Sequence, residues 1–161
     1  MPVVLRHNPK LDLNVVEYHG AMTLAELKAL AAFQAQNPAH LQRDALTVIL
    51  SDADFSGVDL QALDALFARY SAMFTPLDFQ FLRRSAWLCF NERARTHVHY
   101  WVNGRDTRST MSSAVRCFDT YAEAADWLVL TSEEAVLLET RAGFDEIVRY
   151  QIPISLVRAA R

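Results

Sequence analysis

His97 and His99 are the residues whose types and spacing come nearest to a metal site. Two imidazoles on one face bind zinc, and residues i and i+2 share a face on a strand. On a helix they lie about 200° apart and cannot hold one ion. The pattern predicts a helix over residues 91–103, although residues 96–102 are also rich in β-forming types. We therefore expect no metal site, with His97 near an apolar face and His99 in solvent.

Asp52-Ala-Asp54 is the second pattern that could do chemistry, and it follows an apolar run. It is similar to the motif of haloacid-dehalogenase-type phosphatases, in which the first Asp attacks phosphorus and the second donates a proton beside Mg²⁺. Here Phe-Ser-Gly follows instead of that family's Gly-Thr, and both lysines, Lys10 and Lys28, precede the motif. A metal-dependent hydrolase using Asp52 and Asp54 is thus an alternative. The expected role is an acidic loop before a helix N-terminus, where the helix dipole favours negative charge.

Arginines are concentrated between positions 83 and 116, where seven of them occur. Arginine suits bidentate binding of carboxylate or phosphate. Because Arg105, Arg108 and Ser109 lie close together in the sequence, they are a candidate anion-binding loop. The other interpretation is a solvated surface with salt bridges to acidic residues.

Composition limits the classes of protein that the chain can belong to. Its 161 residues, 52% of them apolar, are enough for one domain with a full core. A net charge of −3 argues against a nucleic-acid partner or an anionic membrane surface. The first residues lack the apolar region of a signal peptide, and no stretch approaches about 20 apolar residues. We expect a cytoplasmic protein that does not bind membranes.

The elements that position these residues are marked by helix caps and apolar runs. Thr23-Leu-Ala-Glu26, Thr120-Tyr-Ala-Glu123 and Thr131-Ser-Glu-Glu134 each fit the capping box. Further helices are predicted over residues 58–74 and 91–103, the latter capped by Asn91 and stopped by Gly104. Strands are predicted, in order, at 3–7, 13–19, 46–50, 85–90 and 114–118.

This order predicts an α/β fold. We expect one mixed, largely parallel sheet of about four to five strands with helices packed on it. The first two strands form a hairpin around Asn8-Pro-Lys10. Residues 131–161 follow as a C-terminal extension of one helix and an apolar run of strand character at 147–157, which Pro153 places at an edge of the sheet or outside it. The extension folds back onto the domain or covers a second subunit.

Two segments resemble the STAS (SpoIIAA-like) family. Val48 to Leu63 looks like that family's strand, acidic loop and helix start, and Cys117 to Leu128 looks like its last strand and closing helix. The likeness covers roughly residues 11–130 of a single domain that we take to span 1–161. It implies a regulatory or protein-interaction module. Anti-sigma-factor antagonists of the family carry a phosphorylatable serine after an Asp, but the matching pair here is Asp59-Leu60, and Ser56 is offset from it.

We therefore expect a non-catalytic interaction module without a cofactor. The expected contact surface comprises Asp52, Asp54, Ser56 and Asp59. Its partner would be another protein or a second copy, the latter as a homodimer formed through the C-terminal extension. One alternative is a protein that binds a small anionic or amphipathic ligand with its arginine-rich region and aromatic residues such as Trp101. The other is the hydrolase described above.

Overall fold

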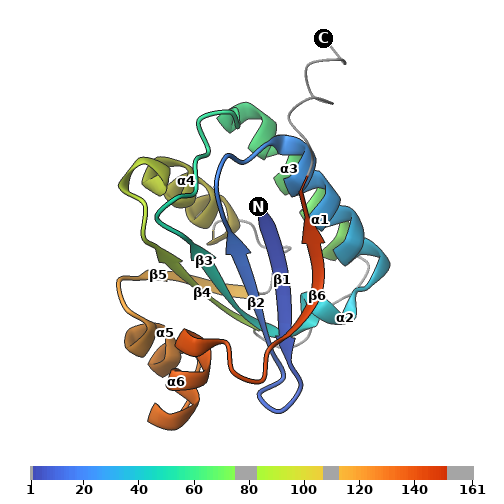
Figure 1. Cartoon of the computed structure of the whole chain (residues 1–161). Coiled ribbons are helices and arrows are strands. Elements are labelled where there is room, and N and C mark those ends of the chain that lie inside the picture. Colours follow the sequence, from blue (N-terminus) through green and yellow to red (C-terminus); the bar gives the residue numbers. More distant parts are fainter. Residues whose placement is uncertain (1, 75–82, 107–112, 152–161) are drawn as a thin grey trace.

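A computed structural model describes residues 2–74, 83–106 and 113–151. Its strands form a single six-stranded sheet with the order β5-β4-β3-β2-β1-β6 (Figure 1). The strands are β1 (Val3–Asn8), β2 (Leu13–Tyr18), β3 (Asp44–Ile49), β4 (Arg83–Cys89), β5 (Ser113–Phe118) and β6 (Asp145–Tyr150). The helices are α1 (Leu24–Gln36), α2 (Ala39–Gln42), α3 (Leu60–Phe74), α4 (Arg95–Asp106), α5 (Tyr121–Trp127) and α6 (Ser132–Thr140). No described helix is both long and apolar enough to cross a membrane.

The chain begins with the predicted hairpin. β1 and β2 pair antiparallel from Val3 opposite Tyr18 to Asn8 opposite Leu13. The Asn8 side-chain oxygen accepts the backbone N–H groups of Lys10 and Leu11 at 2.9 and 3.2 Å, which closes the turn. This use of an asparagine side chain in place of a backbone acceptor is typical of tight turns.

The next strands are parallel, as the alternation of strands and helices predicts. β2, β3, β4 and β5 pair parallel in that order. Apolar residues of α1, α3 and α4 pack on one face of the sheet, and those of α5 and α6 pack on the other (Figure 1). The α/β prediction is confirmed. The sheet has six described strands rather than four or five because the C-terminal extension adds β6.

Three helices start at the predicted capping boxes. The Thr120 and Thr131 hydroxyls accept the backbone N–H groups of Glu123 and Glu134, both at 3.2 Å. At α1, the backbone N–H and the hydroxyl of Thr23 both donate to the Glu26 carboxylate at 2.7 Å. α4 ends at Asp106 rather than at Gly104, since an internal glycine costs a helix only about 1 kcal/mol.

The C-terminal extension joins the main sheet. After α6, Arg141 ends the helix in a left-handed conformation with a φ of 62°. β6 then pairs antiparallel with β1, with an irregularity between Leu5 and Arg6. β6 is an edge strand, as Pro153 suggested, and its described part folds onto its own domain. Residues 152–161, with Pro153 itself, lie outside the described chain.

Candidate functional site

The predicted contact surface lies in the loop of residues 51–59, which we call the acidic loop. It follows β3, at the end of the sheet where the parallel strands finish. Its backbone is tied to the segment after β2 through a parallel bridge between Ala21 and Asp54. Met22 N–H donates to the Asp54 carbonyl, and Asp54 N–H donates to the Gly20 carbonyl, each at 2.7 Å. Two short backbone bonds therefore fix the middle of the loop.

Asn91 fixes the beginning of the acidic loop. Its side-chain NH₂ donates to the carbonyls of Ser51 at 2.9 Å and Ala53 at 2.6 Å. Its side-chain oxygen accepts the backbone N–H of Arg93 at 2.8 Å, which caps the 3₁₀ turn η2 (Glu92–Ala94) that leads into α4. One side chain thus joins the loop after β3 to the loop after β4. The sequence predicted the cap, but not the two bonds across to the neighbouring loop.

Phe55 and His97 fix the end of the acidic loop. The Phe55 ring is buried between the rings of Tyr18 and His97, with centroids 5.7 and 5.8 Å away. The His97 Nε2 lies 3.0 Å from the Val58 carbonyl, so this nitrogen carries the proton and donates. The loop therefore has anchors along its whole length and presents a fixed surface.

The four predicted contact residues, Asp52, Asp54, Ser56 and Asp59, are all exposed. Asp54 accepts the backbone N–H of Ser56 at 2.9 Å, and Asp59 accepts the backbone N–H of Gln61 at 2.9 Å at the start of α3. The bond from the Ser56 backbone lowers the pKa of Asp54. Asp54 is therefore ionised at neutral pH, and the loop presents fixed negative charge.

The arrangement around Asp52 and Asp54 lacks the lysine that the hydrolase alternative needs. Lys10 lies in the turn between β1 and β2, at the opposite end of the strands from the acidic loop. A strand of six residues separates these two ends of the sheet by about 20 Å. Lys28 is exposed on α1. Neither lysine belongs to the set of contacts that holds the acidic loop.

His97 and His99 both lie on α4, so they point in different directions, as the helical prediction implied. His97 is half-buried against Phe55, and His99 is exposed. Within the described residues, no group of three or more His, Cys, Asp or Glu side chains is placed to hold a metal ion.

The arginine-rich region divides among several environments. Arg83 is buried at the start of β4 and donates to the Leu41 carbonyl. Arg84 and Arg116 lie over the Trp127 ring, with their guanidinium carbons 5.5 and 4.3 Å from its centroid. The candidate anion-binding loop cannot be placed, because Arg108, Ser109 and the side chain of Arg105 lie outside the described part of the chain.

Two small cavities lie between the sheet and the helices α1, α3 and α4. They measure about 20 and 40 Å³, and Tyr18, Trp87 and Trp101 line both. One water molecule needs about 10–15 Å³ on this scale, whereas ligand pockets measure about 300–1,000 Å³. The smaller cavity is bordered by His97 and Trp101, whose Nδ1 and Nε1 are buried with no hydrogen-bond partner among the described residues. Single waters suit these atoms, and neither cavity is of a size for a small organic ligand.

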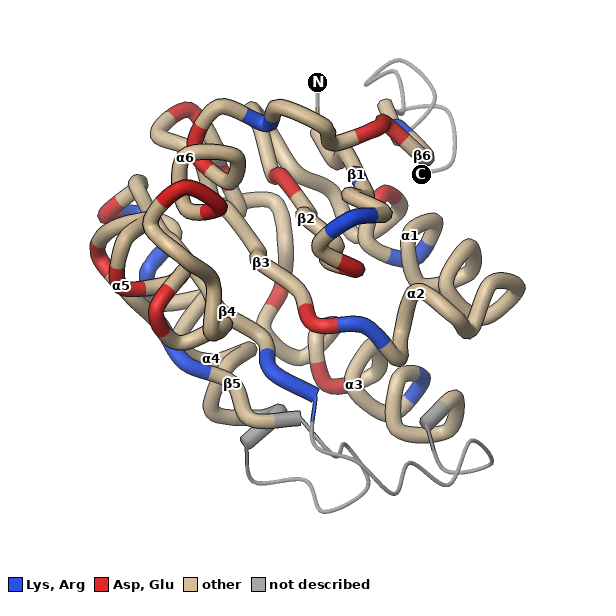
Figure 2. Tube along the Cα trace, turned by 90° about the horizontal axis from the view of Figure 1, so that it is seen from below, with Lys and Arg blue, Asp and Glu red and all other residues tan. Residues whose placement is uncertain are grey.

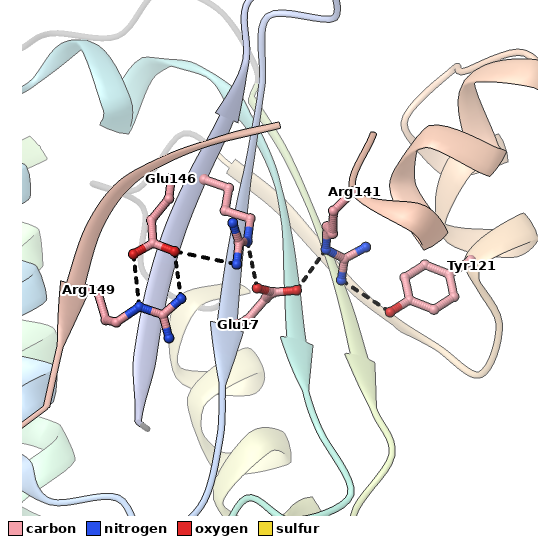
Figure 3. A network of polar contacts seen from close by, with 6 residues as sticks. Glu17, Tyr121, Arg141, Glu146 and Arg149 are labelled. Carbon is pink, nitrogen blue, oxygen red and sulfur yellow. Dashed lines mark hydrogen bonds and ion pairs between the residues drawn. The ribbon is translucent and has the colours of Figure 1, made fainter. Parts of the chain in front are cut away.

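A charged network that the sequence did not indicate lies on the face of the sheet that α5 and α6 cover, opposite the two cavities. Glu17 lies between two arginines: Arg6 Nε is 2.9 Å from one carboxylate oxygen, and Arg141 Nε is 2.8 Å from the other. Figure 3 shows Arg141 between Glu17 and Tyr121. Arg141 also donates to the Tyr121 hydroxyl at 3.2 Å. Glu17 itself is only 7% exposed. The network links β1, β2, α5 and the end of α6.

No model of a known family matches the chain, and no curated protein or solved structure is significantly similar to it.

Proposed function

We propose that this protein is a non-catalytic regulatory module of the STAS-like type that binds a protein partner through the acidic loop. The observation that carries the proposal is the combination of exposed carboxylates and a fixed backbone. Asp52, Asp54 and Asp59 are exposed, while bonds to Gly20, Met22 and Asn91 hold the backbone beneath them. A surface that is ordered before binding loses less conformational entropy on association.

The charge of the loop defines the chemistry of the partner. Carboxylates that project from a rigid loop favour a partner surface rich in lysine or arginine, and such pairs accelerate association at low salt. Asp54 is held ionised by the Ser56 backbone, so its charge persists well below neutral pH. We expect binding to weaken as salt concentration rises, because exposed charges are screened over about 8 Å at physiological ionic strength.

The order of elements supports the STAS-like part of the proposal, since a hairpin precedes successive strand–helix units. The position that carries the phosphorylatable serine in that family is Leu60, the first residue of α3. A leucine accepts no phosphate, so binding through this loop would not be switched at that position. Ser56 is exposed nearby and, like Ser51, is a hydroxyl of the loop that a kinase could reach.

Affinity capture with two matched charge reversals tests the proposal. Asp52→Lys changes the loop, whereas Asp145→Lys makes the same charge reversal at the start of β6. Both side chains are exposed, so both variants are expected to fold. We expect a partner that is captured reproducibly by the wild type and by Asp145→Lys, and lost with Asp52→Lys.

Two results would contradict the proposal. One is a partner that binds Asp52→Lys as well as the wild type. The other is the absence of any reproducible partner together with sedimentation as a monomer, since self-association is the second form of the interaction hypothesis. Self-association through residues 131–161 is separated from loop binding because it should survive Asp52→Lys.

A further inference from the structure

The helices α5 and α6 leave an open groove on the molecular surface. The groove measures about 340 Å³, far more than either internal cavity, and small or apolar residues of both helices line it: Ala122, Ala125, Ala135 and Val136. The two helices are fixed to the sheet by Ala124, Leu128 and Leu138, which belong to the core together with Ala125. The groove is therefore a surface feature of two anchored helices rather than a gap in the core.

Apolar side chains are unusually exposed around this groove. Val136 is 56% exposed on α6, and Val129, in the turn between the helices, is 70% exposed. Val129 also has a φ of 62°, a left-handed conformation that costs a β-branched residue about 1–2 kcal/mol. Glycine or asparagine would satisfy that turn at less cost. The exposed valine is thus unfavourable for the isolated fold, in both solvation and backbone strain.

The charged side chains that α5 and α6 themselves carry have one sign. Residues 119–139 contain six of the 19 acidic side chains of the chain and none of its 16 lysines and arginines. Asp126 and Glu139 line the groove and are exposed, and neither forms an ion pair with another described residue. Figure 2 shows acidic positions along both helices. Arginines contact α5 from the sheet side: Arg84 and Arg116 lie over Trp127, and Arg141 donates to the Tyr121 hydroxyl while it pairs with the buried Glu17.

We propose that the α5–α6 groove is a second docking surface, which binds a basic amphipathic helix of a protein partner. A third helix fits a groove between two helices, because ridges of side chains pack into such grooves. Its apolar side chains would cover Val136 and the alanines, and its lysines or arginines would face Asp126 and Glu139. This surface is distinct from the acidic loop, which belongs to the connection between β3 and α3.

Binding of a defined peptide tests the proposal. The probe is a labelled 16-residue helical peptide of leucine, alanine and lysine, and the control peptide has glutamate in place of every lysine. We expect fluorescence anisotropy to show that the lysine peptide binds the full chain at least tenfold more tightly than the glutamate peptide. Val136→Ser and Glu139→Lys should each weaken binding of the lysine peptide by about fivefold to tenfold, which is about 1–1.4 kcal/mol.

Matched variants elsewhere provide the controls. Ile147→Ser removes an apolar side chain of similar exposure from β6, and Asp52→Lys reverses a charge in the acidic loop. Both should bind the peptide like the wild type, and all four variants should keep the wild-type circular dichroism spectrum. Equal affinity for the two peptides would overturn the proposal, as would unchanged binding by Val136→Ser or Glu139→Lys. Wild-type self-association that Val136→Ser abolishes would also overturn it, because the occupant would then be a second copy. Because Asp52→Lys changes only the acidic loop, the experiment distinguishes a failure of the proposal for the groove from a failure of the proposal for the loop.

Discussion

The Arg141 guanidinium donates to the Glu17 carboxylate over 2.8 Å, although the two residues are 124 positions apart in the chain. Glu17 lies on β2, and Arg141 is the left-handed residue that ends α6. Arg6 of β1 holds the other carboxylate oxygen at 2.9 Å. One buried acid thus connects the N-terminal hairpin to the C-terminal extension, and each arginine would lose one of its partners if the acid were removed.

We therefore expect Glu17→Gln to lower the free energy of unfolding by about 2–3 kcal/mol, because two charge-assisted hydrogen bonds to a buried carboxylate are weakened. Urea denaturation at pH 7 measures the change. Glu146→Gln is the control, since the Glu146 carboxylate is more exposed and its pairs with Arg6 and Arg149 are near the surface. A loss for Glu17→Gln no larger than that for Glu146→Gln would show that the buried network contributes little.

The same carboxylate makes stability depend on pH. Burial opposes ionisation of Glu17, but the bonds and charges of Arg6 and Arg141 outweigh it and hold its pKa below the ordinary value of 4.5. Because the folded-state pKa is the lower one, this stabilisation is present above pH 4.5 and is lost as the pH falls through the folded-state value. The free energy of unfolding of the wild type should therefore fall more between pH 5 and pH 3 than that of Glu17→Gln. Parallel pH profiles for the two proteins would contradict this assignment.

Asn91 should matter for both stability and binding. Asn91→Ala removes two bonds to the carbonyls of the acidic loop and the cap of η2. We expect the free energy of unfolding, measured by thermal or urea denaturation, to fall by about 2 kcal/mol. Hydrogen exchange of loop amides should become faster in this variant, while amides of α1 stay protected. Asp52→Asn, which leaves the backbone anchors in place, should keep the wild-type exchange pattern. Unchanged hydrogen exchange of the loop amides in Asn91→Ala would mean that the remaining anchors are sufficient to hold the loop in place.

The two histidines of α4 should respond differently to mutation. His97→Leu leaves the Val58 carbonyl without its donor and should lower the free energy of unfolding by about 1–2 kcal/mol. His99→Leu changes an exposed position and should alter the free energy of unfolding by no more than about 0.5 kcal/mol. Added zinc should leave the melting temperature of the wild type unchanged, because the imidazoles point apart. A rise in melting temperature that His97→Leu and His99→Leu both remove would establish the metal site that the helix geometry argues against.

Val129 should be replaceable with a gain in stability. Val129→Asn relieves the cost of a β-branched residue at a φ of 62°, and we expect the free energy of unfolding to rise by about 0.5–1 kcal/mol. Val136→Asn makes the same chemical change inside α6, where valine and asparagine have similar helix propensities and no backbone strain is relieved, so it should give no gain. Calorimetry on both variants measures the difference. If docking explains why the valine is kept, Val129→Asn should also weaken binding of the lysine peptide.

Features that depend on neighbouring residues could be predicted from the sequence, and those that depend on distant residues could not. The Thr120 and Thr131 boxes involve contacts over three residues, so their types and spacing are sufficient evidence. The bonds from Asn91 to Ser51 and Ala53 cross about 40 residues, and the bond from Arg141 to Glu17 crosses 124. Nothing in the local pattern indicates such partners.

The place of β6 beside β1 has a consequence for synthesis on the ribosome. The first strand is translated early but obtains its second neighbour only when residues 145–150 emerge. Until then, the outer edge of β1 presents unpaired backbone groups, and such edges recruit strands of other chains. A nascent or truncated chain that ends near residue 130 would contain β1 to β5 and still carry this open edge. The last strand therefore protects the first from aggregation, and we expect chains without it to depend on chaperones.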